Sequence, residues 1–193
     1  MQNWLIPRLS KLTRKHPEIE IRLNVSYTEV DMIRDGISLA IRNDMFSPPP
    51  DVIFQPLIKE EIGLVCSPEF ARRHRLKKLS DLDGIPILTT KTRETIWSDW
   101  LSLHDQSLAL PRPTQTFEHF YLMIQAATYG LGAAVAPKMI VADEIAAGRL
   151  AAPFGFQAGP YNMVLWIAPL VRTRPDLRLL VDWIRFESQK LLS

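Results

Sequence analysis

The chain has 193 residues, of which 47% are apolar and 23% charged, and its formal net charge at pH 7 is +2. This composition is ordinary for a globular protein, and the near balance of charge gives no indication of nucleic acid as a partner. Its single cysteine, Cys66, cannot form an internal disulfide, and no secretory signal opens the chain, so we expect a cytoplasmic protein with a buried structural thiol, without a membrane partner.

The first part of the chain alternates between helical and extended patterns. Apolar residues recur at helical spacing over 4–16, and strict apolar/polar alternation over 19–25 predicts a half-buried strand. A short helix is expected at 30–36. The apolar run 37–41, which leads into Arg42, is typical of a strand buried on both faces.

Two long extended stretches divide the rest of the chain. Residues 54–66 are extended with an expected break at 59–61, and 161–168 are rich in bulky residues; each stretch is interpreted as a crossing between two domains. Between and after them we expect a helical turn at 80–82, strands at 85–88, 114–117 and 131–137, and helices at 96–104, 119–129, 140–147 and 175–192.

Two crossings imply that the first domain is discontinuous. The predicted fold class is α/β, with one subdomain formed by 1–63 and 165–193 and a second formed by 64–164, joined by two crossover strands. Two such lobes form a cleft, and ligands of α/β layers bind at the carboxyl ends of the strands. The expected ligand is therefore a small molecule held between the lobes.

Over nearly the whole chain the residues resemble the effector-binding domain of LysR-type transcriptional regulators, nearest to the glycine-cleavage-activator branch. The resemblance is carried by the order and spacing of these segments: Trp4-Leu5-Ile6-Pro7-Arg8-Leu9 with His16-Pro17; Asp35-Gly36 through Ala40-Ile41-Arg42; Val65-Cys66-Ser67-Pro68; Trp97 to Leu101; Ala126-Ala127 with Gly130-Leu131-Gly132 and Pro137; and Gly148-Arg149-Leu150.

The resemblance implies two periplasmic-binding-protein-like subdomains, a small metabolite in the cleft, and antiparallel homodimers. The dimer surface expected from it pairs the 4–15 helix and the 19–25 strand of one copy with the 119–129 helix and the adjoining strand of the other. The family's helix-turn-helix domain and its first strand have no counterpart here, which indicates a truncated chain that would meet DNA only through the absent domain. Ser38 stands where the family usually has aspartate.

In the first lobe the candidate effector-binding residues are Ser26, Tyr27, Thr28 and Arg42. Arg42 ends a strand at the expected cleft edge, where a guanidinium binds a carboxylate through two hydrogen bonds, although a surface arginine at a strand end would look the same. Hydroxyl groups at 26–28 either bind ligand or cap the following helix. Arg42 favours a carboxylate or amino acid as the effector.

In the second lobe the candidates are Thr89, Thr90, Glu118, His119 and Phe120. The two threonines end the strand at 85–88, and the other three open the helix after the strand at 114–117. His119 is a candidate donor and Phe120 an apolar wall, with turn formation and a structural histidine as the alternatives.

No pattern in the chain indicates an enzyme, a metal or a cofactor. Its four histidines are scattered, and no nucleophile has a base at a recognisable spacing. Two other functions stay open: a solute-binding protein of a transporter, which a signal peptide would favour, and an interfering dimerisation partner of full-length regulators.

Overall fold

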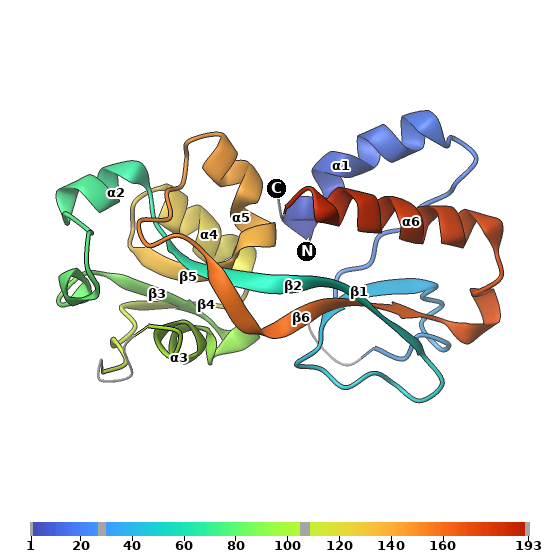
Figure 1. Ribbon diagram of the computed structural model, residues 1–193, viewed down its shortest axis with the longest axis horizontal. Helices are drawn as coiled ribbons and strands as arrows, with labels where there is room; N and C mark the ends of the chain where they lie inside the picture. The colour runs from blue at the N-terminus through green and yellow to red at the C-terminus, as the bar shows by residue number, and fades with distance from the viewer. Residues whose placement is uncertain (1, 27–29, 105–108, 192–193) are drawn as a thin grey trace. The chain divides into compact units, whose positions relative to one another are not determined.

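The computed structural model describes residues 2–26, 30–104 and 109–191 (Figure 1). The α/β class predicted from the sequence is confirmed, with helices packed on a mixed sheet of strand order β1-β6-β2-β5-β3-β4. In chain order the elements are α1 (Gln2–Lys15), β1 (Leu39–Asn43), β2 (Ile53–Val65), α2 (Pro68–Arg73), η1 (Leu79–Leu82), β3 (Ile87–Thr90), η2 (Lys91–Arg93), α3 (Ile96–Leu101), β4 (Gln115–Phe117), α4 (Phe120–Thr128), β5 (Ala133–Pro137), α5 (Lys138–Ala146), β6 (Gln157–Ile167), η3 (Pro169–Val171) and α6 (Pro175–Gln189).

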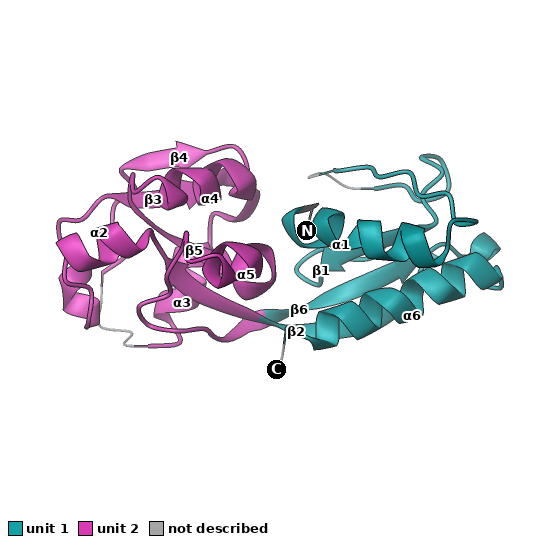
Figure 2. Cartoon of the chain, turned by 90° about the horizontal axis from the view of Figure 1, so that it is seen from above, with its two compact units in different colours: residues 1–60, 161–193 teal, residues 61–160 magenta. Residues whose placement is uncertain are grey.

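The chain divides into two compact units, residues 1–60 with 161–193 and residues 61–160 (Figure 2). Each boundary falls inside a long strand, β2 or β6, and lies three or four residues before the boundary placed from the sequence. The break expected at 59–61 is wrong, because β2 runs without interruption from Ile53 to Val65.

In unit 1, strand β1 pairs antiparallel with β6, and α1 and α6 lie together on one face of these strands (Figure 1). Trp4 and Leu12, two turns apart on α1, are both 1% exposed, and Arg8 between them lies 4.0 Å from Glu187 of α6. Alternate residues of β6, Val164 and Trp166, belong to a separate cluster with Val30 and Met32. Since neighbouring strand residues point to opposite faces, this cluster packs on the face away from α6.

Three expectations for unit 1 are wrong. Residues 19–25 form no strand, because alternation supplies two faces but a strand also needs backbone partners, and the described residues offer none there. Residues 32–36 form a turn that ends at Gly36, with φ of 64°, too short to be a helix. Strand β1 is half-buried throughout and not buried on both faces, because β6 is its only strand partner among the described residues.

Unit 2 contains β3, β4 and β5 as a parallel group, with the last residues of β2 antiparallel to β5. Its core includes Ile62, Leu64, Trp100 and Val135, all fully buried. Ser67 begins α2 by accepting a hydrogen bond from the Phe70 amide at 3.1 Å. Because β3, β4 and β5 are parallel, their carboxyl ends lie at one edge of this unit.

Candidate functional site

At the shared strand edge of unit 2, the two candidate threonines are buried. Thr89 and Thr90 pair in register with Thr116 and Phe117 of β4, so the ends of the two strands lie side by side. Thr90 is completely buried, and its hydroxyl accepts a hydrogen bond from the Thr92 amide at 3.2 Å. This bond caps η2, which is the structural alternative considered for Thr90.

Glu118 follows β4 and meets the segment after β3. Its carboxylate accepts a hydrogen bond from Lys91 Nζ at 2.6 Å, and its carbonyl accepts one from the Thr92 hydroxyl at 3.0 Å. The Lys91 hydrogen bond and charge lower the pKa of Glu118, and the same contact raises the pKa of Lys91. Glu118 is exposed and joins the β3 and β4 ends, which explains its place without a ligand.

His119 and Phe120 lie at the start of α4. His119 has extended backbone angles as the residue preceding the helix, and its ring stacks on Tyr121 with centroids 5.8 Å apart. Phe120 is half-buried and packs against the unit 2 core. All five sequence-predicted residues of this unit therefore gather at one strand edge, with the amide groups of the first turn of α4 beside them.

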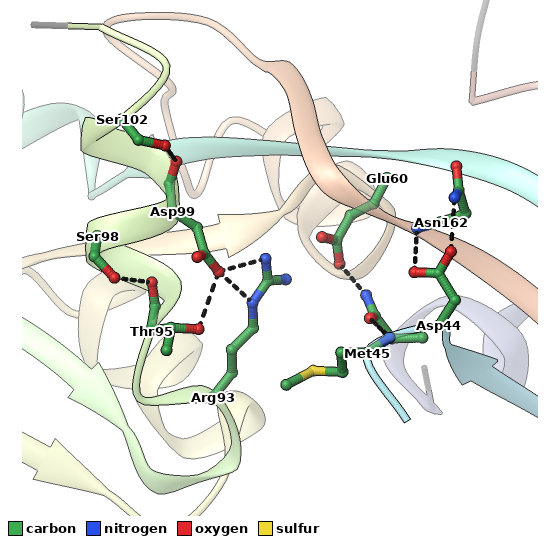
Figure 3. Close-up of polar contacts among 10 residues, drawn as sticks. Asp44, Met45, Glu60, Arg93, Thr95, Ser98, Asp99, Ser102 and Asn162 are labelled. Atoms are coloured by element: carbon green, nitrogen blue, oxygen red, sulfur yellow. Dashed lines mark hydrogen bonds and ion pairs between the residues drawn. The ribbon is translucent and has the colours of Figure 1, made fainter. Parts of the chain in front are cut away.

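A buried ion pair just beyond β3 was not predicted. Arg93 is 4% exposed, and its Nε and Nη2 donate to one oxygen of Asp99 at 3.0 and 2.8 Å (Figure 3). The Thr95 hydroxyl donates to that same oxygen at 3.1 Å. The ion pair fixes the turn that leads from Thr90 to the start of α3. A sequence signal existed in the Arg-x-Thr-x-x-x-Asp spacing, but charged residues near helix starts are usually solvated.

In unit 1, the structure brings Arg42 and Ser26 together. Arg42 Nη1 donates to the Ser26 carbonyl at 3.3 Å, and the guanidinium carbon lies 4.6 Å from the Phe46 ring centre and 5.3 Å from that of Trp166. Burial lowers the pKa of Arg42. Tyr27 and Thr28 lie outside the described residues, so only the carbonyl of this predicted loop is placed.

A second unpredicted group follows directly after Arg42. Asn43 donates to the buried Glu60 at 2.9 Å, and Asp44 accepts from both the amide and the side chain of Asn162 at 2.8 and 2.6 Å (Figure 3). These contacts fasten the end of β1 to β2 and β6 beside the unit boundaries at 60/61 and 160/161. Short polar residues at the end of a strand are typical of an ordinary turn, so the sequence pattern does not indicate that they bond to Glu60 and Asn162 on the neighbouring strands.

The only cysteine of the chain, Cys66, is poorly suited to act as a nucleophile. Cys66 is fully buried, and burial raises the pKa of its thiol to about 12. Among the described residues no group of three or more His, Cys, Asp or Glu side chains is placed to hold a metal ion. In that part of the chain, no helix has both the length and the apolar character needed to cross a membrane.

The strand order, with two long strands that run through both units, defines a two-unit α/β domain. The fold matches the solved AmpR effector-binding domain of Citrobacter freundii, with a TM-score of 0.77, 24% identity, and 96% of this chain and 92% of that chain covered. The regulatory domain of CrgA from Neisseria meningitidis matches with a TM-score of 0.75, 17% identity, and coverage of 96% and 92%.

The family follows from the sequence comparisons. The model of the LysR substrate binding domain matches residues 1–188, and the chain belongs to this family of transcription-regulator domains. The regulator TrpI of Pseudomonas aeruginosa is 35% identical over 190 residues, which cover 96% of this chain and 63% of that protein. DsdC of Escherichia coli is 31% identical over 195 residues, which cover 95% and 61%. The chain thus spans less than two thirds of these relatives.

The comparisons do not single out the glycine-cleavage branch. The glycine cleavage system transcriptional activator of Escherichia coli is 30% identical over 160 residues, covering 79% of this chain and 50% of that protein. That similarity is of the same order as the similarity to the other regulators, so membership of the branch stays a prediction.

Proposed function

We propose that this LysR domain senses a small effector, binding it with residues of both units, and passes the binding event to a DNA-binding domain of the same regulator. In unit 1 the effector contacts the Ser26–Thr28 loop and Arg42. In unit 2 it contacts Thr89, Thr90, Glu118, His119 and Phe120. The domain has no catalytic role in this account, and it works in the cytoplasm.

Arg42 is the observation that carries the proposal. Its guanidinium is half-buried between two aromatic rings at the end of β1, and burial lowers its pKa. A charged group that has lost part of its hydration gains from a negatively charged partner. A guanidinium also presents its N–H groups in one plane, which suits a carboxylate. These properties support a small carboxylate or an amino acid as the effector.

The mechanism requires that the effector prefer one arrangement of the units. A ligand shifts a conformational equilibrium only by the difference in its affinity for the two states. Contacts to both units provide such a difference, because one arrangement satisfies both sets of contacts and the other satisfies only one. The resulting change is transmitted through a homodimer in this account.

The dimer surface proposed here comprises α1, residues 19–25 and α4 with the strand that follows it. Apolar side chains are exposed at both parts: Leu23 and Val25 are 49% and 51% exposed, and Tyr129 is 82% exposed. Burying such side chains in a partner stabilises association. Light scattering after gel filtration measures the mass, and a Tyr129→Glu variant is expected to shift dimer to monomer.

Two other functions are separated from this proposal by experiment. A solute-binding protein would bind ligand as a monomer with no effect on an operator complex. An interfering partner would reduce operator binding when mixed with a full-length regulator, with or without effector. The effector-sensing account predicts that the ligand changes the operator complex only when the domain is joined to its DNA-binding domain.

A thermal-shift screen tests the proposal directly. The chain is heated with each of the twenty amino acids and a set of small mono- and dicarboxylates, and a ligand raises the melting temperature progressively with concentration. Arg42→Lys keeps the charge but loses the planar donor pair, so it is expected to abolish the shift. Arg73→Gln, which removes a 61% exposed side chain outside the proposed dimer surface, is the control and should leave the shift unchanged. A shift that survives Arg42→Lys contradicts the proposed site.

A further inference from the structure

A group of positive side chains lies at the end of α2 and in the turn that follows it in unit 2 (Figure 1). The near balance of charge over the whole chain conceals this group, because positions 72–78 contain five cationic residues and no carboxylate. All five are exposed, and together they are called the α2 basic patch: Arg72, Arg73, Arg75, Lys77 and Lys78.

Only part of this positive charge is neutralised within the chain. Glu69 pairs with Arg73 across one turn of α2, with 2.5 Å between the carboxylate oxygen and Nη2. Asp81 follows the patch, but its Oδ2 already accepts the backbone amides of positions 77 and 78 at 2.9 and 3.0 Å. Among the described residues, no ion pair or side-chain hydrogen bond holds Arg72 or Arg75. Both guanidinium groups are therefore available to a partner.

The backbone at Arg75 is unusual for an arginine. Its φ is 51°, in the left-handed region that residues with a side chain rarely adopt. The Arg75 amide donates to the Arg72 carbonyl at 3.2 Å. The Leu76 amide donates to the Ala71 carbonyl at 3.1 Å, and the two bonds together form a Schellman motif. Glycine is the usual residue at the position of Arg75, because it takes a positive φ without steric cost. A backbone outlier of this kind indicates that the arginine side chain has a use other than folding.

The patch surrounds a shallow hollow with a volume of about 480 Å³. Its lining consists of Ala71, Arg72, Arg75, Leu76 and Lys77. Ala71 is half-buried and Leu76 is 7% exposed, so the hollow offers no exposed apolar side chain against which a partner could pack. Long cationic side chains around a hollow without an apolar centre suit a hydrophilic anion.

This chemistry separates a nucleic-acid partner from a protein partner. Protein interfaces are centred on buried aromatic or aliphatic side chains and are depleted in lysine. Protein–DNA interfaces are more polar and more positively charged, and lysine and arginine on phosphates supply much of their affinity. The α2 basic patch has the second character. Since the chain belongs to a family of transcription-regulator domains, duplex DNA is the polyanion that the patch fits best.

We propose that the α2 basic patch binds the sugar–phosphate backbone of duplex DNA without reading the base sequence. The guanidinium groups of Arg72 and Arg75 donate charge-assisted hydrogen bonds to phosphate oxygens, and the two lysines add electrostatic attraction. Contacts to phosphates position a protein on DNA but carry no sequence information. This contact departs from the expectation that the chain meets DNA only through an absent domain. It is independent of the effector site proposed above.

Fluorescence anisotropy of a labelled duplex of random sequence, titrated with the 193-residue chain, tests the proposal. Neutralisation of about four phosphates, by the patch residues other than Arg73, predicts that the logarithm of the affinity falls with the logarithm of the salt concentration with a slope of about −3.6. Arg75→Gly removes one cation and supplies the residue that the Schellman motif prefers. At about 50 mM salt it should weaken the affinity about tenfold, and it should make the slope shallower by about 0.9. Its melting temperature should be unchanged or higher, which separates lost binding from lost folding.

Two further variants test the charge and its location. Glu69→Gln releases Arg73 from its ion pair, so it should strengthen the binding and steepen the slope. Lys59→Gln removes an exposed cation of unit 1 that lies outside the patch, and it should leave the slope unchanged. Duplexes of different base sequence should bind equally well, because only the backbone is contacted.

Several results would overturn the proposal. Absent binding, a slope that Arg75→Gly leaves unchanged, or an equal loss of affinity in Lys59→Gln each contradict it. Tighter binding of poly-glutamate than of DNA at equal charge concentration would assign the patch to an acidic protein instead. Tripolyphosphate that displaces DNA at an equal phosphate concentration would assign it to a free small anion. The effector proposal stands or falls separately, since it depends on Arg42 and not on the α2 basic patch.

Discussion

Replacing Asp99 with asparagine tests the ion pair that shapes the β3 end of the candidate site. Asp99 receives two hydrogen bonds from Arg93 and one from Thr95 on a single oxygen, and Arg93 is 4% exposed. Asp99→Asn preserves the shape but removes the negative charge that accepts the hydrogen bonds of Arg93 and Thr95. Breaking a buried pair costs about 3–5 kcal/mol, and the partial exposure of Asp99, 16% for its side chain, favours the lower value of about 3 kcal/mol.

Thermal and urea unfolding of the variant measure this cost. For a chain of this length a loss of about 3 kcal/mol lowers the melting temperature by roughly 6–12 °C. The exposed pair of Glu69 and Arg73 supplies the matched control, because Glu69→Gln should change stability by less than about 0.5 kcal/mol. A double replacement, Arg93→Met with Asp99→Leu, should recover much of the loss. If Asp99→Asn melts within about 1 °C of the wild type, the account of the buried pair is wrong.

Three further perturbations follow from individual contacts. Burial raises the pKa of Cys66 to about 12, so the contribution of this thiol to stability is full below about pH 9 and declines as the pH rises toward 12. Iodoacetamide at pH 8 should therefore leave the thiol of the folded protein unmodified and react with it only after unfolding. Labelling of the native protein at the rate of a free thiol would refute this. Gly132→Ala places a methyl group 2.7 Å from the Pro86 carbonyl oxygen, so urea unfolding should show that the free energy of unfolding falls by about 2 kcal/mol. An unchanged free energy of unfolding would mean that the two backbones separate freely. The hydrogen bond from Lys91 lowers the pKa of Glu118, so any stabilisation from the pair is present above the usual carboxyl range and is lost as the pH falls through the lowered pKa. Carbon NMR of Lys91→Met should show the midpoint of the Glu118 titration at a higher pH than in the wild type. An unchanged titration midpoint would exclude the contact.

The sequence predicted most elements because their signals are local. Helical spacing in α1, the left-handed Gly130 after α4 and the buried small residues of β5 each depend on neighbours within a few positions. The grouping of the unit 2 candidates also followed from a local rule, since parallel strands bring their carboxyl ends to one edge.

The failures concern partners that are distant in the sequence. Alternation over 19–25 says which side chains share a face, but it cannot say whether another strand is available to pair, and here Ile19 is buried while Leu23 and Val25 stay exposed. The contact of Asn43 with Glu60 and that of Asp44 with Asn162 depend on strand neighbours rather than on spacing.

We propose that one small effector is bound by residues of both units. Titration calorimetry of the compound that gives the largest thermal shift measures this with two single variants, Arg42→Lys in unit 1 and Thr89→Val in unit 2. The account predicts that each variant weakens the affinity by about tenfold or more, because each removes a hydrogen bond to a desolvated polar ligand. An affinity that changes in only one of the two variants, or in neither, contradicts the claim.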